Sequence, residues 1–172
     1  MTISSFARDY AADAKVAEHT HGSDQVIFGT RGVMEVAASR RFWLIAPHFA
    51  VWIPARTRHR IRMSGAVSMR TLYLRRELGT NLPVTGTVFY VTPLLRELTV
   101  EAVRIGSLLE SDPLHQALRA LIVMQVQKAS PVPTSVTLPS DPRALAVATQ
   151  FIAAPAARAS LQEMCAAAGA TV

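Results

Sequence analysis

The sequence contains a single cysteine, Cys165, and little charge, since 17% of its 172 residues are Asp, Glu, Lys or Arg. One cysteine excludes an internal disulfide framework and is typical of a reducing compartment, so we expect a cytoplasmic protein. No apolar run is long enough to span a bilayer, and the first residues lack the apolar core of a signal peptide. We therefore expect no membrane partner. Half of the residues are hydrophobic, which indicates a folded protein.

Two common catalytic signatures are also missing. The glycines are scattered singly rather than gathered into a phosphate-binding loop, and no G-x-S-x-G nucleophile elbow occurs. The acidic residues near the histidines in sequence, Glu18, Asp24 and Glu35, form no evident catalytic pair. We therefore expect that the chain is not an enzyme. The net charge of +6 and the isoelectric point of about 10.4 admit an acidic partner such as DNA without identifying one.

Residues 1–91 have the pattern of short β-strands. Runs such as QVIF, RFWLIA, FAVWI and SMRTLYL are rich in β-branched and aromatic residues and are separated by Gly, Pro, Asn and Ser. Several short strands at this spacing predict a sandwich or barrel. In RHRIRM (58–63), the alternation predicts that the arginines face water while His59 shares the apolar inner face.

After Val91 the apolar period becomes helical, which predicts two amphipathic helices within residues 92–129, the first with an apolar stripe from Leu94 to Leu109. Asp112 as N-cap and Pro113 at the first helical position mark the start of the second helix. These helices can pack on the barrel or on a second subunit, and we expect a homodimer. The expected dimerisation residues are Leu94, Leu98, Ile105, Leu114, Leu118 and Leu121.

A proline-rich linker is predicted over residues 130–140, followed by two short helices within 141–172. Asp141 can cap the first of them, and Ser160 with Glu163 forms a predicted capping box on the second. Cys165 falls on the inner stripe of that second helix. It is therefore expected to be a small core residue rather than a nucleophile.

Two short motifs, HTHGSDQ (19–25) and PARTRH (54–59), resemble the two-part signature of cupin barrels. The resemblance implies that His19, His21, Gln25 and His59 line one site. Gln25 stands where a glutamate is typical of cupins, and Arg56 stands where a glycine is typical. Three imidazoles suit a divalent transition metal: Zn, Ni, Fe or Cu.

The glutamine at position 25 bears on whether a metal binds. Three neutral imidazoles and a neutral amide leave the metal's charge uncompensated, and burying such charge is costly. This favours weak metal binding, or an anionic co-ligand supplied by an effector. The alternatives are a metal-free effector pocket and histidines with only structural partners. Trp43 and Trp52 are core candidates that could also line a pocket.

The whole arrangement resembles the AraC/XylS-type transcriptional regulators, through AVWIPARTRHRI, MRTLYL, LLREL and SDPRALAVA…SLQEMCAAAGATV. The resemblance implies a mainly β fold with helices. It consists of a cupin-like, jelly-roll sensor barrel over 1–91, a helical dimerisation segment over 92–129, the linker, and an incomplete helix-turn-helix domain over 141–172.

This resemblance implies the effector-sensing and dimerisation portion of a regulator, with a small-molecule effector bound in the barrel. SLQEMCAAAGATV resembles the first helix and turn of a helix-turn-helix, whose recognition helix reads DNA. We expect the chain as given to bind no specific DNA site, because it lacks that recognition helix, and the DNA-binding residues are therefore unknown. The alternative is a stand-alone metal-dependent cupin enzyme, a dioxygenase or an isomerase.

Overall fold

The computed structural model describes residues 3–75, 82–133, 135–153 and 159–170. The chain divides into two compact units, Met1–Ser135 and Val136–Val172, and each is considered by itself. One short strand, β9 (Ser135–Thr137), lies at the division. It falls inside the segment predicted as a linker.

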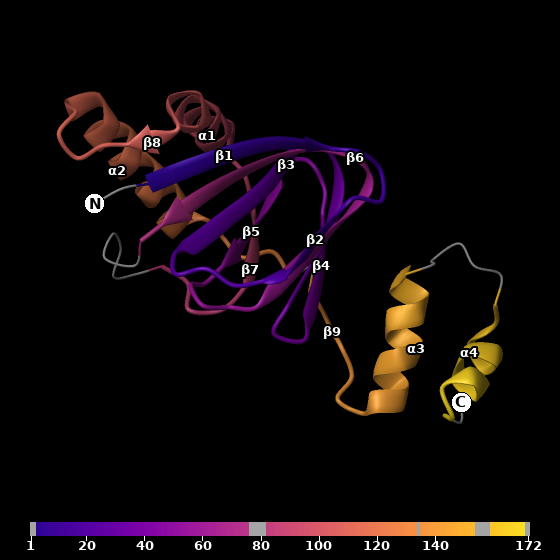
Figure 1. The fold of residues 1–172 in the computed structure, drawn as a ribbon. Helices are drawn as coiled ribbons and strands as arrows, with labels where there is room; N and C mark the ends of the chain where they lie inside the picture. Colours follow the sequence, from indigo (N-terminus) through magenta and orange to yellow (C-terminus); the bar gives the residue numbers. More distant parts are fainter. Residues whose placement is uncertain (1–2, 76–81, 134, 154–158, 171–172) are drawn as a thin grey trace. The chain divides into compact units, whose positions relative to one another are not determined.

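The first unit is a cupin-like barrel of antiparallel strands with two helices on its outside (Figure 1). Its strands are β1 (Ile3–Tyr10), β2 (Lys15–His19), β3 (Asp24–Ala38), β4 (Arg41–Ile45), β5 (Phe49–Ile53), β6 (His59–Leu74), β7 (Thr87–Tyr90) and β8 (Ser107–Leu108). They pair in the order β7-β5-β3-β6-β1-β8, with β2 added to β6 and β4 added to β3. The predicted fold, a cupin-like barrel followed by helices, is confirmed.

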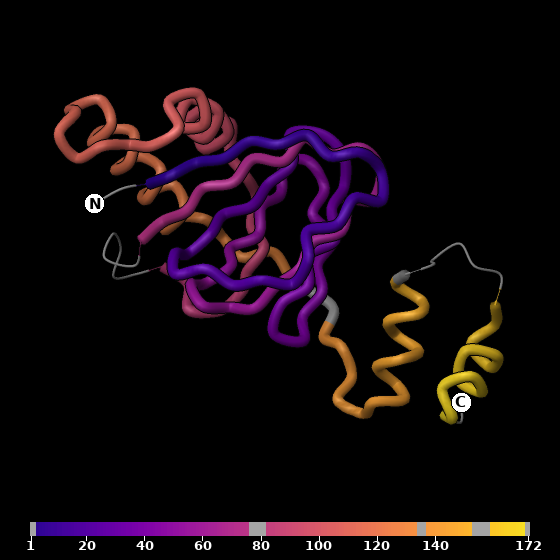
Figure 2. The backbone as a smooth tube through the Cα atoms, in the orientation of Figure 1, coloured from indigo at the N-terminus to yellow at the C-terminus, as the bar shows by residue number. Residues whose placement is uncertain are grey.

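The two long strands β3 and β6 organise the barrel, because each takes part in pairings at both ends (Figure 2). The register between them shifts around Gly29 and Arg31, which bends both strands. Gly32 adopts a φ of 80°, and a Cβ added there would collide with the carbonyl oxygen of Ala66. Only glycine allows this close approach of the two backbones.

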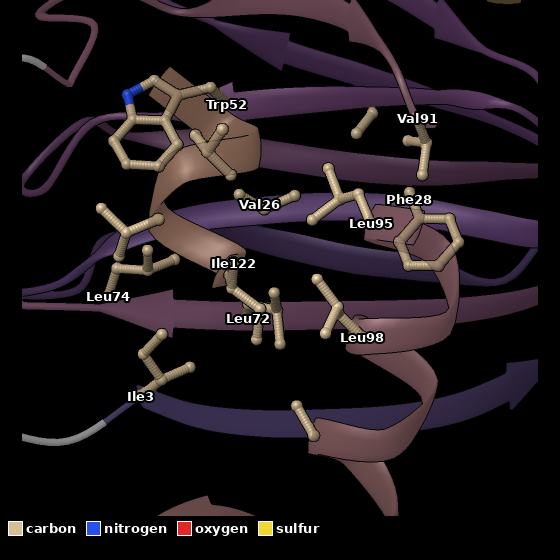
Figure 3. Close-up of a cluster of buried hydrophobic side chains, with 14 of the residues drawn as sticks. Ile3, Val26, Phe28, Trp52, Leu72, Leu74, Val91, Leu95, Leu98 and Ile122 are labelled. Atoms are coloured by element: carbon tan, nitrogen blue, oxygen red, sulfur yellow. The ribbon is translucent and has the colours of Figure 1, made fainter. Parts of the chain in front are cut away.

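Alternating side chains along these strands build two separate apolar clusters. One fills the barrel and includes Ile27, Met34, Trp43 and Met63. The other lies between the sheet and the two helices (Figure 3). Its largest members include Ile3, Val26, Phe28, Trp52, Leu72, Leu74, Leu95, Leu98 and Ile122.

The two helices of this unit are α1 (Pro93–Ile105) and α2 (Pro113–Lys128). The N-cap prediction for Asp112 is confirmed, because its carboxylate accepts the backbone N–H groups of the next helix. The predicted stripe of the first helix extends too far, to Leu109. The helix ends at Ile105 because Gly106 adopts a φ of 89°, and the chain then forms β8 against β1.

The second unit contains α3 (Pro142–Ala153) and α4 (Leu161–Ala167). The capping box of Ser160 and Glu163 is present, as predicted. Cys165 is buried beside Met164 and Val147, so the prediction of a small core residue is confirmed. Among the described helices of both units, none is long and apolar enough to cross a membrane.

Candidate metal and effector site

The three histidines of the two sequence motifs lie together in the first unit. His19 ends β2 and lies opposite His59, the first residue of β6, in their antiparallel pairing. The ring centroids are 4.3 Å apart for His19 and His59, and 5.0 Å apart for His21 and His59. One ring nitrogen from each histidine lies within 4.8 Å of the other two. The structure thus brings together side chains that are up to 40 positions apart in sequence.

All three rings are oriented by backbone carbonyl groups. Each Nδ1 faces a carbonyl oxygen, that of Ala17, Ser23 or Thr57, at 2.6 to 2.9 Å. A carbonyl oxygen only accepts hydrogen bonds, so Nδ1 carries the proton in each ring. The Nε2 atoms are therefore the available metal-binding atoms. Such a second hydrogen bond from the other ring nitrogen is the usual arrangement of metal-ligating histidines.

His59 is the most enclosed of the three, with no solvent-exposed surface. Burial, the largest effect, lowers the pKa of His59 to about 4, so its ring is neutral at physiological pH. Among the described residues, its Nε2 atom is buried without a hydrogen-bond partner. A buried polar atom without a partner is costly, and a metal ion would satisfy it.

Gln25 contacts the cluster through its side-chain oxygen. Its Oε1 lies 2.7 Å from Nε2 of His21, while its amide nitrogen donates to Oγ1 of Thr71 at 2.9 Å. The hydroxyl of Thr71 in turn donates to the carbonyl oxygen of Val26 at 2.9 Å. Since that hydroxyl has only one proton, reversing the amide would leave a buried acceptor unsatisfied. Thr71 therefore holds the oxygen of Gln25 toward the histidines.

This arrangement places two electron pairs face to face when His21 is neutral. Its Nδ1 proton is directed at Ser23, so its Nε2 and the Gln25 oxygen both offer lone pairs across 2.7 Å. A cation shared by the two atoms resolves that repulsion. Together with the partnerless nitrogen of His59, the donor set of three imidazoles and one carbonyl oxygen fits a divalent transition metal.

Backbone hydrogen bonds connect the second motif (54–59) to the first motif (19–25). The backbone N–H of Arg56 donates to the carbonyl oxygen of His21, and that of Ala55 donates to the carboxylate of Asp24. Arg56 has a φ of 62°, a conformation that favours glycine. Glycine, the residue typical of the motif that this segment resembles, adopts such a φ without strain. The arginine adopts it here, and its backbone N–H still bonds to His21.

Two residues of this site were not predicted from the sequence, Thr71 and Tyr73. The Tyr73 ring packs edge-on against His21, with centroids 5.2 Å apart, and burial raises the pKa of its hydroxyl. Both residues alternate with Leu72 in SMRTLYL, so their shared face could have been read from the period. That this face meets Gln25 depends on the pairing register of β3 and β6, which no local pattern reveals.

The two tryptophans occupy different places. Trp52 is fully buried between the sheet and the helices, and its indole N–H donates to the carbonyl oxygen of Pro83 at 2.8 Å. Trp43 lines a cavity of about 230 Å³ together with Arg41, Thr57 and Gly86. Trp43 therefore lies at a cavity of the kind expected, and the three histidines are not among the residues that line this cavity.

The six leucine and isoleucine residues predicted for dimerisation divide into two groups. Leu98 and Leu118 are buried in the cluster between the helices and the sheet, and Ile105 packs against it. Leu94, Leu114 and Leu121 are exposed, at 48%, 60% and 41% of their surface. The first group supports the packing of the helices on the barrel, and the second remains available to a partner.

Comparison with known proteins gives two informative likenesses, although no family model matches the chain. Over 100 residues, or 58% of this chain, it is 24% identical to the HTH-type transcriptional regulator NimR of Escherichia coli K12. The match covers 36% of that regulator, so the chain spans about a third of its length. ToxT of Vibrio cholerae, solved with a bound unsaturated fatty acid, matches 99% of this chain and 70% of its own. Its TM-score is 0.53 at 9% identity.

A cupin superfamily protein from Desulfitobacterium hafniense also matches, at 18% identity and a TM-score of 0.41. That match covers 42% of this chain and 67% of the other. The ToxT likeness extends over nearly the whole chain and shows a shared fold. The sequence of this chain is similar to that of a transcriptional regulator over 58% of its length.

Proposed function

We propose that this chain is the effector-sensing and dimerisation portion of an AraC-type transcriptional regulator, and that DNA binding belongs to the full-length protein. Its sequence similarity to a helix-turn-helix regulator supports the proposal, as does the fold shared with ToxT over 99% of the chain. In this proposal the barrel senses a small molecule, and the chain is not an enzyme.

The observation that carries the proposal is that β3 and β6 contact the histidine cluster with one face and the helices with the other. Gln25 and Thr71 face the histidine cluster, whereas their neighbours Val26 and Leu72 face the opposite side. There Val26 and Leu72 belong to the same apolar cluster as residues of α1 and α2 (Figure 3). A ligand that repositions Gln25 or Thr71 therefore acts on strands that directly support the helices. Packed interiors transmit such shifts because they deform little.

His19, His21, His59 and Gln25 are the residues that would hold a divalent metal, with Zn, Ni, Fe and Cu as candidates. When bound, the metal supplies a localised positive charge at which an effector with an anionic or polar group can be anchored. Tyr73 remains a neutral phenol at physiological pH, because burial raises its pKa, and its hydroxyl can donate to such a ligand.

The exposed face of α2 is the proposed contact with a second copy of the chain. Leu114, Leu121 and Met124 lie on it, and 60%, 41% and 46% of their surfaces are exposed. With Ala117 and Lys128, they recur at alternating steps of three and four residues. This is the spacing of a two-helix seam, and the same face on two copies is self-complementary about a two-fold axis.

Hydrogen–deuterium exchange tests the proposed transmission from site to helices. The exchange of α1 and α2 amides is measured in the chelator-stripped protein with and without Zn²⁺, beside a His59→Asn variant. We expect Zn²⁺ to slow exchange in both helices of the unaltered protein and to leave the variant unchanged. Bound Zn²⁺ with unaltered exchange in both helices would contradict the transmission. Turnover of a substrate at the metal would instead support the enzyme alternative.

A further inference from the structure

The four side chains that would bind a metal supply no negative charge. Each of the three rings directs its Nδ1 at a carbonyl oxygen, so an imidazole that binds a metal through Nε2 contributes no negative charge. The fourth donor, the oxygen of Gln25, is also neutral. Among the described residues, the potential metal-binding group contains no carboxylate. A divalent ion on these four donors keeps its whole charge.

Reversing the side-chain amide of Gln25, so that its nitrogen faced the histidines in place of its oxygen, would be costly. Gln25 and Thr71 are 2% and 0% exposed, so an unsatisfied polar atom at either residue would remain without water. With the oxygen toward His21, the amide of Gln25 donates to Thr71 and the hydroxyl of Thr71 donates to Val26, so both acceptors behind the amide have a donor. Reversing the amide would leave one of the oxygens behind it without a donor. Thr71 is thus a positioning residue, which acts on the cluster through Gln25.

The carboxylates that lie closest to the histidines in sequence, those of Glu18 and Asp24, form other contacts. The carboxylate of Asp24 accepts the backbone N–H of Ala55 at 2.7 Å, which stabilises the turn of the second motif. Glu18 forms a salt bridge with Arg58 on the exposed surface, at 3.2 Å. Both carboxylates are held in other contacts. Among the described residues no carboxylate belongs to the histidine cluster, so we expect a ligand to supply the compensating charge, because an uncompensated ion in a partly buried site is unfavourable.

We propose that the cluster binds a divalent metal together with a small oxyanion, of which a carboxylate is the simplest, and that the two ligands stabilise each other's binding. This inference rests on the proposed metal-dependent sensing and names the class of effector. Because the coupling is reciprocal, a metal-loaded barrel recognises an anionic effector that the metal-free barrel binds poorly. Thr71 is needed because it keeps the Gln25 oxygen on the metal.

The test is a calorimetric titration of chelator-stripped protein with Zn²⁺, in sodium acetate and in sodium chloride of equal ionic strength, with acetamide as a neutral control. We expect acetate to raise the Zn²⁺ affinity roughly tenfold, a typical coupling, and acetamide to have no effect. Co²⁺ in place of Zn²⁺ provides a second readout, because acetate binding at the metal changes its visible spectrum. Equal affinities in acetate and chloride, with an unchanged Co²⁺ spectrum, would overturn the proposal.

Three variants separate the inference from the metal site itself. Gln25→Glu supplies the missing charge and is expected to bind Zn²⁺ more tightly and to lose the acetate effect. Thr71→Val is expected to weaken Zn²⁺ binding by roughly 10-fold or more, as for other residues that orient a metal-binding side chain. Thr71→Ser keeps the hydroxyl and is expected to restore the binding. If Thr71→Val binds like the unaltered protein, the positioning role is wrong. If the unaltered protein binds no metal even in acetate, the metal site of the proposed function fails instead.

Discussion

His19 and His59 lie opposite each other in the pairing of β2 with β6, with ring centroids 4.3 Å apart. The pairing register shifts between Val16 and His19, so the last residue of β2 meets the first residue of β6. The two sequence motifs thereby become one cluster, with His21 supplied by the turn that follows. The barrel geometry, rather than either motif alone, creates the site.

Replacing Gly32 by alanine is expected to destabilise the first unit by about 3 kcal/mol or more. The added Cβ would collide with the carbonyl oxygen of Ala66, in addition to the unfavourable φ of 80°. Gly65→Ala is the matched control, because Gly65 also has a positive φ but has no atom near its missing Cβ. It should cost only about 1 kcal/mol. Urea denaturation measures both values, and equal losses would contradict the account of the bend.

Leu98→Ala is expected to destabilise the first unit by about 2–5 kcal/mol, since Leu98 is 7% exposed within the cluster between helices and sheet. Thermal and urea unfolding measure the loss. The residue was predicted as a dimer contact. If its replacement shifted only the monomer–dimer equilibrium without lowering stability, the packing of α1 on the barrel would be wrong.

The double variant Leu114→Glu/Leu121→Glu is expected to convert a dimer into a monomer. Both side chains are exposed on α2, so the charges would repel across the proposed interface without disturbing the barrel. Leu109→Glu serves as the control, because Leu109 is 52% exposed but lies beyond the end of α1. Sedimentation equilibrium distinguishes the species. A monomeric unaltered protein at high concentration, or a double variant that remains dimeric, would remove the proposed interface.

Lowering the pH should reduce the helix content of the second unit through Glu163. Its hydrogen bonds from the backbone N–H and hydroxyl of Ser160 hold the pKa of Glu163 below the ordinary 4.5. A lowered pKa in the folded state gives a stabilisation that is present above pH 4.5 and lost as the pH falls through the folded-state value.

Glu163→Gln is the matched control for this pH dependence, because glutamine can also complete a capping box but does not titrate. Circular dichroism on the intact chain between pH 6 and pH 3 gives the readout. Because the first unit also titrates, the relevant quantity is the difference between the two proteins. Identical pH profiles would show that Glu163 contributes no pH-dependent stabilisation.

Local sequence patterns predicted much of the architecture. The alternation in RHRIRM indicated an inward His59, and the caps at Asp112 and Ser160 marked helix starts that the structure confirms. These features depend on neighbouring residues alone. The three histidines and Gln25 were placed in one site through the cupin resemblance, and the structure shows them in contact.

Features that depend on non-local contacts escaped prediction. The predicted stripe through Leu109 continues past Gly106, because periodicity does not register the pairing of β8 with β1 that follows the end of α1. Leu98 and Leu118 have the same helical spacing as the exposed leucines, and only the position of the sheet decides which of them are buried. The role of Thr71 likewise follows from a register between β3 and β6 and from hydrogen-bond directions.

The most direct test of the account is the metal content of tag-free protein, determined by elemental mass spectrometry after dialysis in acetate buffer. His59→Asn removes the buried Nε2 donor, and His48→Asn is the control because His48 lies at a positive φ that asparagine tolerates, outside the cluster. The account predicts close to one divalent transition metal per chain in the unaltered protein and in His48→Asn, and a loss of metal in His59→Asn. Metal-free unaltered protein, or equal metal in all three, would contradict it.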